Sequence, residues 1–175
     1  LDHIDRGELD ADVCLAVASR SGIAGIDLLA EQDLDVAVAR ESGDDPETGD
    51  DRVYAWLEET HPDLICLCGY LRLLKISPWM HERTLNIHPA LLPKFGGKGM
   101  YGMRVHQAVI DQGESTSGCT VHYVDEEYDH GPTILQRTCD VGPADTPQSL
   151  ANRIFDLECE AYPTAIKMVG TQLKV

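Results

Sequence analysis

Basic residues are scarce in this sequence. Lys and Arg together number 14 against 30 Asp and Glu, which gives the 175 residues a formal net charge of −16 at pH 7. A surface of this sign repels nucleic acid and anionic membranes, so neither is expected as a partner. An anionic substrate would have to be held by local donors such as backbone N–H groups.

Long apolar runs are also missing. No segment is long enough to cross a bilayer, and the first residues show no signal-peptide pattern. The six Cys do not have the spacing of a disulfide framework. A metal pair at Cys66 and Cys68 is one interpretation, but no second Cys/His pair at finger-like spacing completes it. The favoured interpretation is buried, reduced thiols and a cytoplasmic location. The thiols concerned lie in apolar, strand-like runs: Cys14, Cys66, Cys68, Cys119 and Cys139.

Apolar runs and helical patterns alternate along the chain, which predicts one α/β domain over residues 1–175. We expect a Rossmann-like, mostly parallel, twisted sheet flanked by helices. The acidic stretch 41–51 is predicted to be a loop, and a helix is predicted to start at Ser77. The predicted strands are 12–18, 36–38, 64–67, 84–87, 117–124 and 132–141. The predicted helices are 26–32, 51–60, 105–112 and 146–169.

The first residues resemble the end of a helix that Gly7 stops. A domain rarely starts inside a helix, so we expect a preceding segment and an N-terminal strand that this chain lacks. The 12–18 strand or the 64–67 strand should then show an unpaired edge.

Two polar segments carry the chemistry. Asn86-Ile87-His88-Pro89 offers an amide and an imidazole, and Asp129 lies in a later Tyr-Asp-His-Gly-Pro segment. An amide N–H stabilises an oxyanion, and an imidazole with a carboxylate moves a proton, which is the equipment of acyl-group chemistry. Ligands bind beyond the carboxyl ends of parallel strands, so the three side chains are expected to converge there. The alternative is structural: an Asn that satisfies a turn and a His-Pro pair that ends a strand.

The longer context of both segments resembles a known family. Residues 84–95 read TLNIHPALLPKF and residues 118–132 read GCTVHYVDEEYDHGP. Both are similar to signatures of the formyltransferases that use 10-formyltetrahydrofolate, and the resemblance covers residues 1–169. The match is to members that formylate the primary amine of glycinamide ribonucleotide in de novo purine biosynthesis. The resemblance implies an enzyme with the folate as co-substrate, no metal, and a monomeric or homodimeric state.

The resemblance also implies the catalytic roles. Asn86 would donate to the formyl oxygen, and His88 would stabilise the developing charge and assist proton transfer. Asp129 would orient a water that removes the amine proton and would tune His88. His122 would support the three.

Binding residues follow from the same resemblance. The folate would be bound by Leu71, Arg72, Leu73, Leu74, Asn86, Asp125 and Asp129. The ribonucleotide would contact Pro89 and Glu158, and the Gly-rich segment 96–102 would be a mobile loop over the amine substrate. A plain apolar turn at 71–74 and a solvated helix Glu at 158 are the structural alternatives.

Three other functions use related sequences. A formyltetrahydrofolate hydrolase carries a similar Asn/His/Asp set but activates water, and its motif differs after the His. A methionyl-tRNA formyltransferase needs a basic tRNA-binding extension, which the net charge of −16 argues against. A non-catalytic folate-binding relative is the third alternative.

Overall fold

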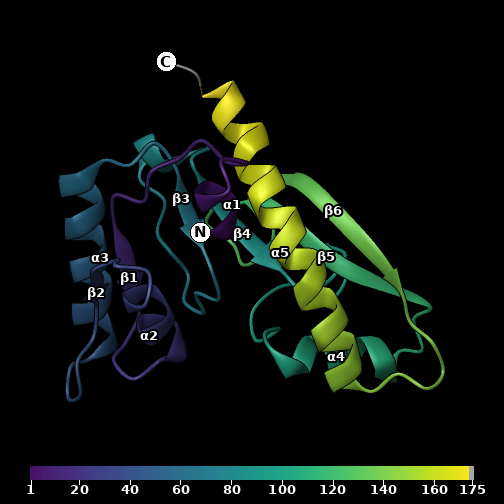
Figure 1. The fold of residues 1–175 in the computed structure, drawn as a ribbon. Helices are drawn as coiled ribbons and strands as arrows, with labels where there is room; N and C mark the ends of the chain where they lie inside the picture. Colours follow the sequence, from purple (N-terminus) through teal and green to yellow (C-terminus); the bar gives the residue numbers. More distant parts are fainter. Residues whose placement is uncertain (174–175) are drawn as a thin grey trace. The chain divides into compact units, whose positions relative to one another are not determined.

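The computed structural model describes residues 1–173, which form two compact units that divide after Asp63 (Figure 1). The first unit contains α1 (Asp2–Asp5), β1 (Ala16–Ala18), α2 (Ala24–Ala30), β2 (Val36–Val38) and α3 (Pro46–Thr60). Strands β1 and β2 pair in parallel, with α2 in the connection between them. The unit therefore contains a short βαβ motif.

Helix α3 begins earlier than predicted, so the loop prediction for 41–51 is wrong from Pro46 onward. Asp45 caps the helix, because its side chain accepts from the Thr48 N–H at 2.8 Å. Pro46 follows at the first helical position, where its missing N–H has no helical partner to lose. Val53 and Leu57 form the buried face of α3. An N-cap and a proline thus outweigh the acidic composition of the segment.

The second unit is built on a four-stranded sheet with the order β3-β4-β5-β6. Its elements are β3 (Ile65–Leu67), the 3-10 helix η1 (Pro78–Met80), β4 (Thr84–His88), α4 (Met103–Asp111), β5 (Thr116–Tyr123), β6 (Thr133–Asp140) and α5 (Pro147–Gln172). Strands β3 and β4 run parallel, whereas β5 is antiparallel to both β4 and β6. The two last predicted strands, 117–124 and 132–141, are thus neighbours in the sheet. The fold is mixed α/β, with parallel elements flanked by helices.

Helix α5 crosses β5 and β6 and supplies much of the core (Figure 1). Thr146 caps it in a capping box with Ser149, so the helix begins where the sequence predicted. Its fully buried positions include Leu150, Ile154 and Ala165, which pack in one cluster with residues of β4, β5 and α4. The hydroxyl of Tyr162 lies 3.0 Å from the Leu67 carbonyl oxygen and 3.1 Å from that of Leu85. This contact attaches α5 to β3 and β4.

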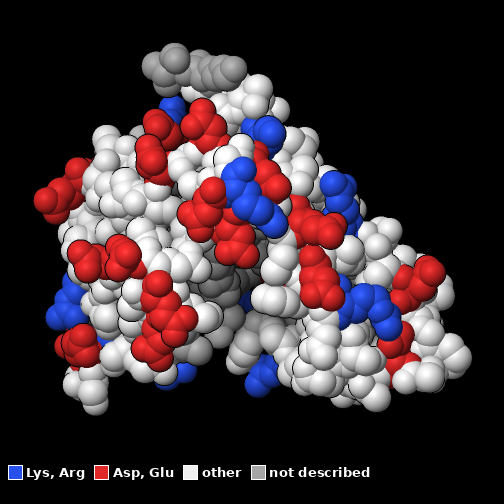
Figure 2. Space-filling model, viewed as in Figure 1, with Lys and Arg blue, Asp and Glu red and all other residues white. Residues whose placement is uncertain are grey.

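The surface is acidic, as the composition predicts. On the face seen in Figure 2, acidic side chains outnumber basic ones. No helix within residues 1–173 is long and apolar enough to span a membrane.

The cysteines are free, but several are not buried as predicted. Cys14, Cys66 and Cys68 are exposed, whereas Cys119 is fully buried. Within the described part of the chain, β1 pairs only with β2, and β3 pairs only with β4. Side chains on or beside such edge strands lack a neighbour that would cover them.

Candidate active site

Strands β4 and β5 place three polar side chains on one face of the sheet. Asn86 and His88 are two residues apart on β4, so they point to the same side. His122 on β5 is the direct cross-strand partner of Asn86. The Asn86 Nδ2 lies 3.1 Å from the His122 Nε2.

Asp129 does not reach this face from the carboxyl end of a parallel strand, as was expected. Because β5 is antiparallel to β4, it ends with Tyr123 opposite Leu85, one residue before Asn86 on β4. The loop 124–131 then brings Asp129 back to the β4 side chains, with the residue itself at φ 54°. Gly131 permits this return, since a Cβ there would overlap the Tyr123 carbonyl oxygen.

The side chains of Asn86, His88 and His122 converge around Asp129. Its Oδ1 accepts from Asn86 Nδ2 at 3.4 Å and lies 3.7 Å from His122 Nε2. Its Oδ2 accepts from the Gly97 N–H at 2.9 Å and lies 3.5 Å from His88 Nδ1. The structure therefore brings together the residues that the motifs predicted, and their catalytic roles stay predictions.

The hydrogen bonds define which ring nitrogens carry protons. His88 Nε2 lies 2.7 Å from the Phe95 carbonyl oxygen, which only accepts, so Nε2 carries the hydrogen. His122 Nδ1 likewise donates to the Tyr123 carbonyl at 2.7 Å. In a neutral ring, His122 Nε2 then accepts from Asn86, whose amide nitrogen must face it. The orientation of the Asn86 amide follows from this network.

Burial and charge set the protonation states. Burial lowers the pKa of His88, although the nearby Asp129 carboxylate works in the opposite direction. Burial opposes ionisation of Asp129, but the contacts with His122, His88 and the Gly97 N–H lower its pKa overall. At neutral pH an unprotonated His88 Nδ1 therefore faces a carboxylate oxygen at 3.5 Å. Two acceptors in this position form a site that can receive one proton.

The backbone of 95–97 contacts the site residues directly. The sequence interpretation placed 96–102 over the amine substrate but did not predict these backbone contacts. Phe95 provides the carbonyl for His88, and Gly97 provides the N–H for Asp129. A Cβ on Gly96 would collide with the Leu92 side chain and lie 3.1 Å from the Asp129 Cβ. The two adjacent glycines after Leu-Leu-Pro were the available signal. They allow a close approach of the backbone to the Asp129 carboxylate.

The predicted folate segment lies between β3 and η1. Leu71 and Leu73 are 59% and 37% exposed, and Arg72 is also exposed. Leu74 is buried at 2%. Two neighbouring exposed leucines are better explained by contact with an apolar ring system than by a plain surface turn. The folate role of the segment stays a prediction.

The remaining predicted residues have these environments. Asp125 accepts from the Glu127 N–H at 2.9 Å and lies 2.8 Å from His130 Nδ1. Burial disfavours its charge, but these hydrogen bonds lower its pKa overall. Pro89 follows β4 directly. Glu158 lies on α5, where burial raises its pKa to about 7.

His106 lies on α4 and is buried, at 5% exposure. Its Nδ1 has no hydrogen-bond partner within the described residues. Across residues 1–173, no group of three or more His, Cys, Asp or Glu is placed to hold a metal ion.

An α/β sheet that carries an amide, two imidazoles and a carboxylate in mutual contact has the layout of an acyl-transfer site. Comparison with known sequences agrees with this class. Residues 1–166 match the family model described as Formyl transferase. The chain belongs to the formyl transferase family.

Individual relatives point in the same direction. The chain is 36% identical over 168 residues to a chloroplastic phosphoribosylglycinamide formyltransferase of Arabidopsis thaliana, which covers 94% of this chain and 56% of that protein. It is 30% identical to the human trifunctional purine biosynthetic protein adenosine-3, covering 98% of this chain and 17% of that protein. The crystal structure of glycinamide ribonucleotide transformylase 1 from Geobacillus kaustophilus superimposes with a TM-score of 0.81 at 34% identity. That match covers 96% of this chain and 88% of the other. The chain thus spans about half the length of the plant relative that it matches.

Proposed function

We propose that this protein transfers the formyl group of 10-formyltetrahydrofolate to the primary amine of glycinamide ribonucleotide, as phosphoribosylglycinamide formyltransferases do. The observation that carries the proposal is the contact of Asp129 with both Asn86 and His88. The names of the plant and Geobacillus relatives support the choice of acceptor. The reaction would serve purine biosynthesis.

Asn86 would stabilise the negative charge that forms on the formyl oxygen. One of its N–H groups is bonded to His122 at 3.1 Å, and the other reaches Asp129 only at the long distance of 3.4 Å. The weaker bond is the one that can be exchanged for a formyl oxygen. The donor is already oriented by His122, so little reorganisation is needed when the charge appears.

His88 and Asp129 would receive the proton that the amine loses. When the amine nitrogen attacks the formyl carbon, it becomes cationic and must release a proton. The tetrahedral intermediate then collapses as the bond from the formyl carbon to the folate N10 breaks, and N10 takes up a proton as tetrahydrofolate leaves. The unprotonated His88 Nδ1 and the Asp129 Oδ2, 3.5 Å apart, both lack a hydrogen on the side that faces the other. A proton delivered there, directly or through a water held by Asp129, turns two opposed acceptors into an attractive pair. Because the amine is the nucleophile, no covalent enzyme intermediate is required.

Substrate binding would use the residues around this centre. Leu71 and Leu73 would form apolar contacts with the folate ring, with polar contacts from the 71–74 backbone, Arg72 and Asp125. Pro89 and Glu158 would lie on the ribonucleotide side. A cytoplasmic location is part of the proposal, and the free state of the cysteines supports it. A monomer or homodimer is expected.

The test is an assay of the intact protein with 10-formyltetrahydrofolate in the presence and absence of glycinamide ribonucleotide. Formyl transfer predicts a formylated ribonucleotide, with deformylation of the folate that depends on the ribonucleotide. Release of formate at the same rate without the ribonucleotide would show a hydrolase instead. Folate binding with no turnover under either condition would indicate a non-catalytic relative.

A further inference from the structure

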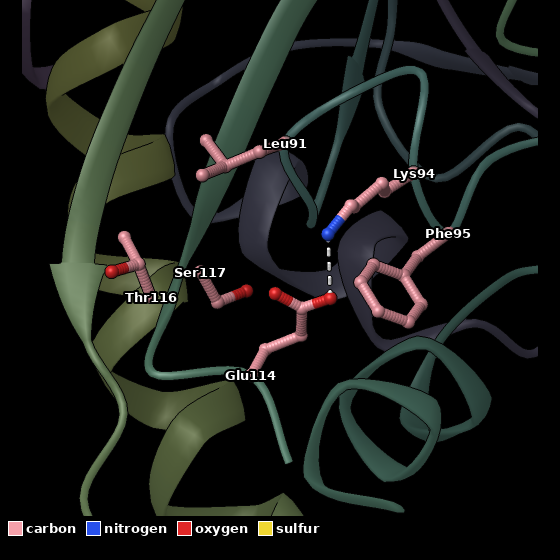
Figure 3. A pocket seen from close by; sticks show the side chains of 6 residues that line it. All are labelled: Leu91, Lys94, Phe95, Glu114, Thr116 and Ser117. Carbon is pink, nitrogen blue, oxygen red and sulfur yellow. Dashed lines mark hydrogen bonds and ion pairs between the residues drawn. The ribbon is translucent and has the colours of Figure 1, made fainter. Parts of the chain in front are cut away.

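A small cavity lies in the second unit, and its lining residues do not include the four side chains of the candidate active site (Figure 3). Its volume is about 250 Å³. The lining comes from the segment after β4 and from the start of β5: Leu91, Lys94, Phe95, Glu114, Thr116 and Ser117. Pockets for drug-sized ligands have volumes of roughly 300–1,000 Å³. This cavity therefore has the size for a smaller metabolite.

Ser117 gives the cavity an unused polar group. The residue is only 2% exposed, and its hydroxyl oxygen has no hydrogen-bond partner within residues 1–173. Figure 3 shows this oxygen directed into the pocket, on the side of the Glu114 carboxylate. A buried hydroxyl without a partner is unfavourable, and a polar ligand atom in the cavity would satisfy it.

The charges across the cavity restrict the type of ligand. Lys94 Nζ and Glu114 Oε1 form an ion pair at 2.7 Å, with the Lys94 side chain 65% exposed and the Glu114 side chain 25% exposed. A ligand with a single charge that entered between them would pair with one and lose the attraction to the other, which only a ligand with both charges would keep. A zwitterion would bind its carboxylate to Lys94 and its ammonium to Glu114. Both charges would then stay paired.

Apart from Thr116, the other lining residues are apolar. Leu91 and the ring of Phe95 border the same space (Figure 3). They suit an aliphatic side chain of a few carbons. We propose that this cavity binds a small zwitterion with an apolar side chain, namely an aliphatic α-amino acid.

Occupation of the cavity would be transmitted to the active site through one residue. The ring of Phe95 lines the cavity, while its carbonyl accepts the hydrogen bond from His88 at 2.7 Å. Phe95 has a φ of 60°, which is rare for a residue with a side chain and signals a locally strained backbone. A ligand that moves the ring shifts the carbonyl that holds His88.

Titration of the intact protein with L-leucine tests the binding site, using calorimetry for affinity and NMR for the His88 ring signals. The matched probes are 4-methylpentanoate, which lacks the ammonium, and 3-methylbutylamine, which lacks the carboxylate. We expect saturable binding of L-leucine, about tenfold weaker or worse binding of each analogue, and a change in the His88 signals at saturation. No saturable binding of L-leucine, or equal affinities for all three compounds, would overturn the proposal.

Variants locate the binding. Glu114→Gln should weaken L-leucine binding about tenfold or more, and Ser117→Ala should weaken it several-fold. Glu160→Gln changes an exposed Glu on α5 and is the matched control, for which no change is expected. Thermal unfolding of each variant verifies the fold. Unchanged affinity in a folded Glu114→Gln protein would place the ligand elsewhere, and saturation without any change at His88 would refute the coupling through Phe95.

Discussion

The imidazole of His88 and the backbone carbonyl of Phe95 are joined by a 2.7 Å hydrogen bond that leaves only Nδ1 free to change its protonation state. The same Nδ1 faces the Asp129 carboxylate at 3.5 Å. A backbone group thus decides which nitrogen of His88 can act as a base. The roles proposed for the other residues depend on this arrangement.

The first prediction concerns the protonation of His88. Burial lowers its pKa, so the ring should be the neutral Nε2–H tautomer at pH 7 and gain its second proton only below pH 6.5. Because the neutral ring is the proposed base, kcat should fall on the acid side with a midpoint below about 6.5. Nitrogen-15 NMR of the ring measures the tautomer and its protonation, and a pH profile measures the fall in kcat. A His88 that titrates above pH 7 would contradict the assignment.

Replacement of Asp129 by Asn should nearly abolish turnover. The amide oxygen can still accept from the Gly97 N–H, but the negative charge that receives the proton is gone. We expect kcat to fall by about 10²–10⁴-fold, with a smaller change in the KM for the folate. Asp156→Asn, an exposed position on α5, is the control. Steady-state kinetics comparable to those of the unmodified protein would remove Asp129 from the mechanism.

Gly96→Ala should reduce activity by disturbing the approach of the 95–97 backbone to Asp129. The added methyl group would displace the Leu92 side chain and press on Asp129 at 3.1 Å. A loss of about tenfold or more in kcat is expected, since small displacements of catalytic groups are costly. Gly170→Ala on α5 is the control, because its new Cβ meets nothing within 4 Å. The control variant should be more stable by about 0.5–1 kcal/mol, with unchanged kcat. Equal kcat values for the Gly96→Ala and Gly170→Ala variants would contradict the role of Gly96.

Glu158 should make stability depend on pH. Burial raises its pKa from 4.5 to about 7, so the native state binds a proton that the unfolded state has released between these values. The free energy of unfolding should therefore fall as pH rises from about 4.5 to 7, by roughly 1–3 kcal/mol from this group. Glu158→Gln should remove that part of the decrease. Denaturant unfolding at several pH values measures it, and parallel curves for the two proteins would show that Glu158 does not contribute.

Tyr162→Phe should destabilise the second unit without changing its shape. The variant loses the hydroxyl that contacts the Leu67 and Leu85 carbonyls in a buried position. A cost of about 1–2 kcal/mol in the free energy of unfolding is expected. Tyr101→Phe removes the hydroxyl of a tyrosine that is 41% exposed, so it should have little effect on the unfolding midpoint. Equal midpoints for the two variants would mean that the Tyr162 contacts add no stability.

Local signals in the sequence were enough to predict several features of this protein. The strand at Val36–Val38, the helix capped by Thr146 and the strand that carries Asn86 and His88 were predicted close to their observed bounds. These elements have local causes: a short apolar run, an N-cap followed by Pro, and residues alternating across a strand. The Asn, His and Asp of the site were found because their chemistry depends on residue type.

The way in which these parts meet depends on contacts between residues far apart in the sequence. Strand composition does not distinguish parallel from antiparallel pairing, so the direction of β5 and the return path of Asp129 could not be predicted. The cap at Asp45 was a local signal, but the acidic composition of the surrounding residues led to the prediction of a loop. Phe95 and Gly97 act through backbone atoms, which every residue possesses. A backbone donor or acceptor gains a role only from its position in the fold, and the sequence does not mark it.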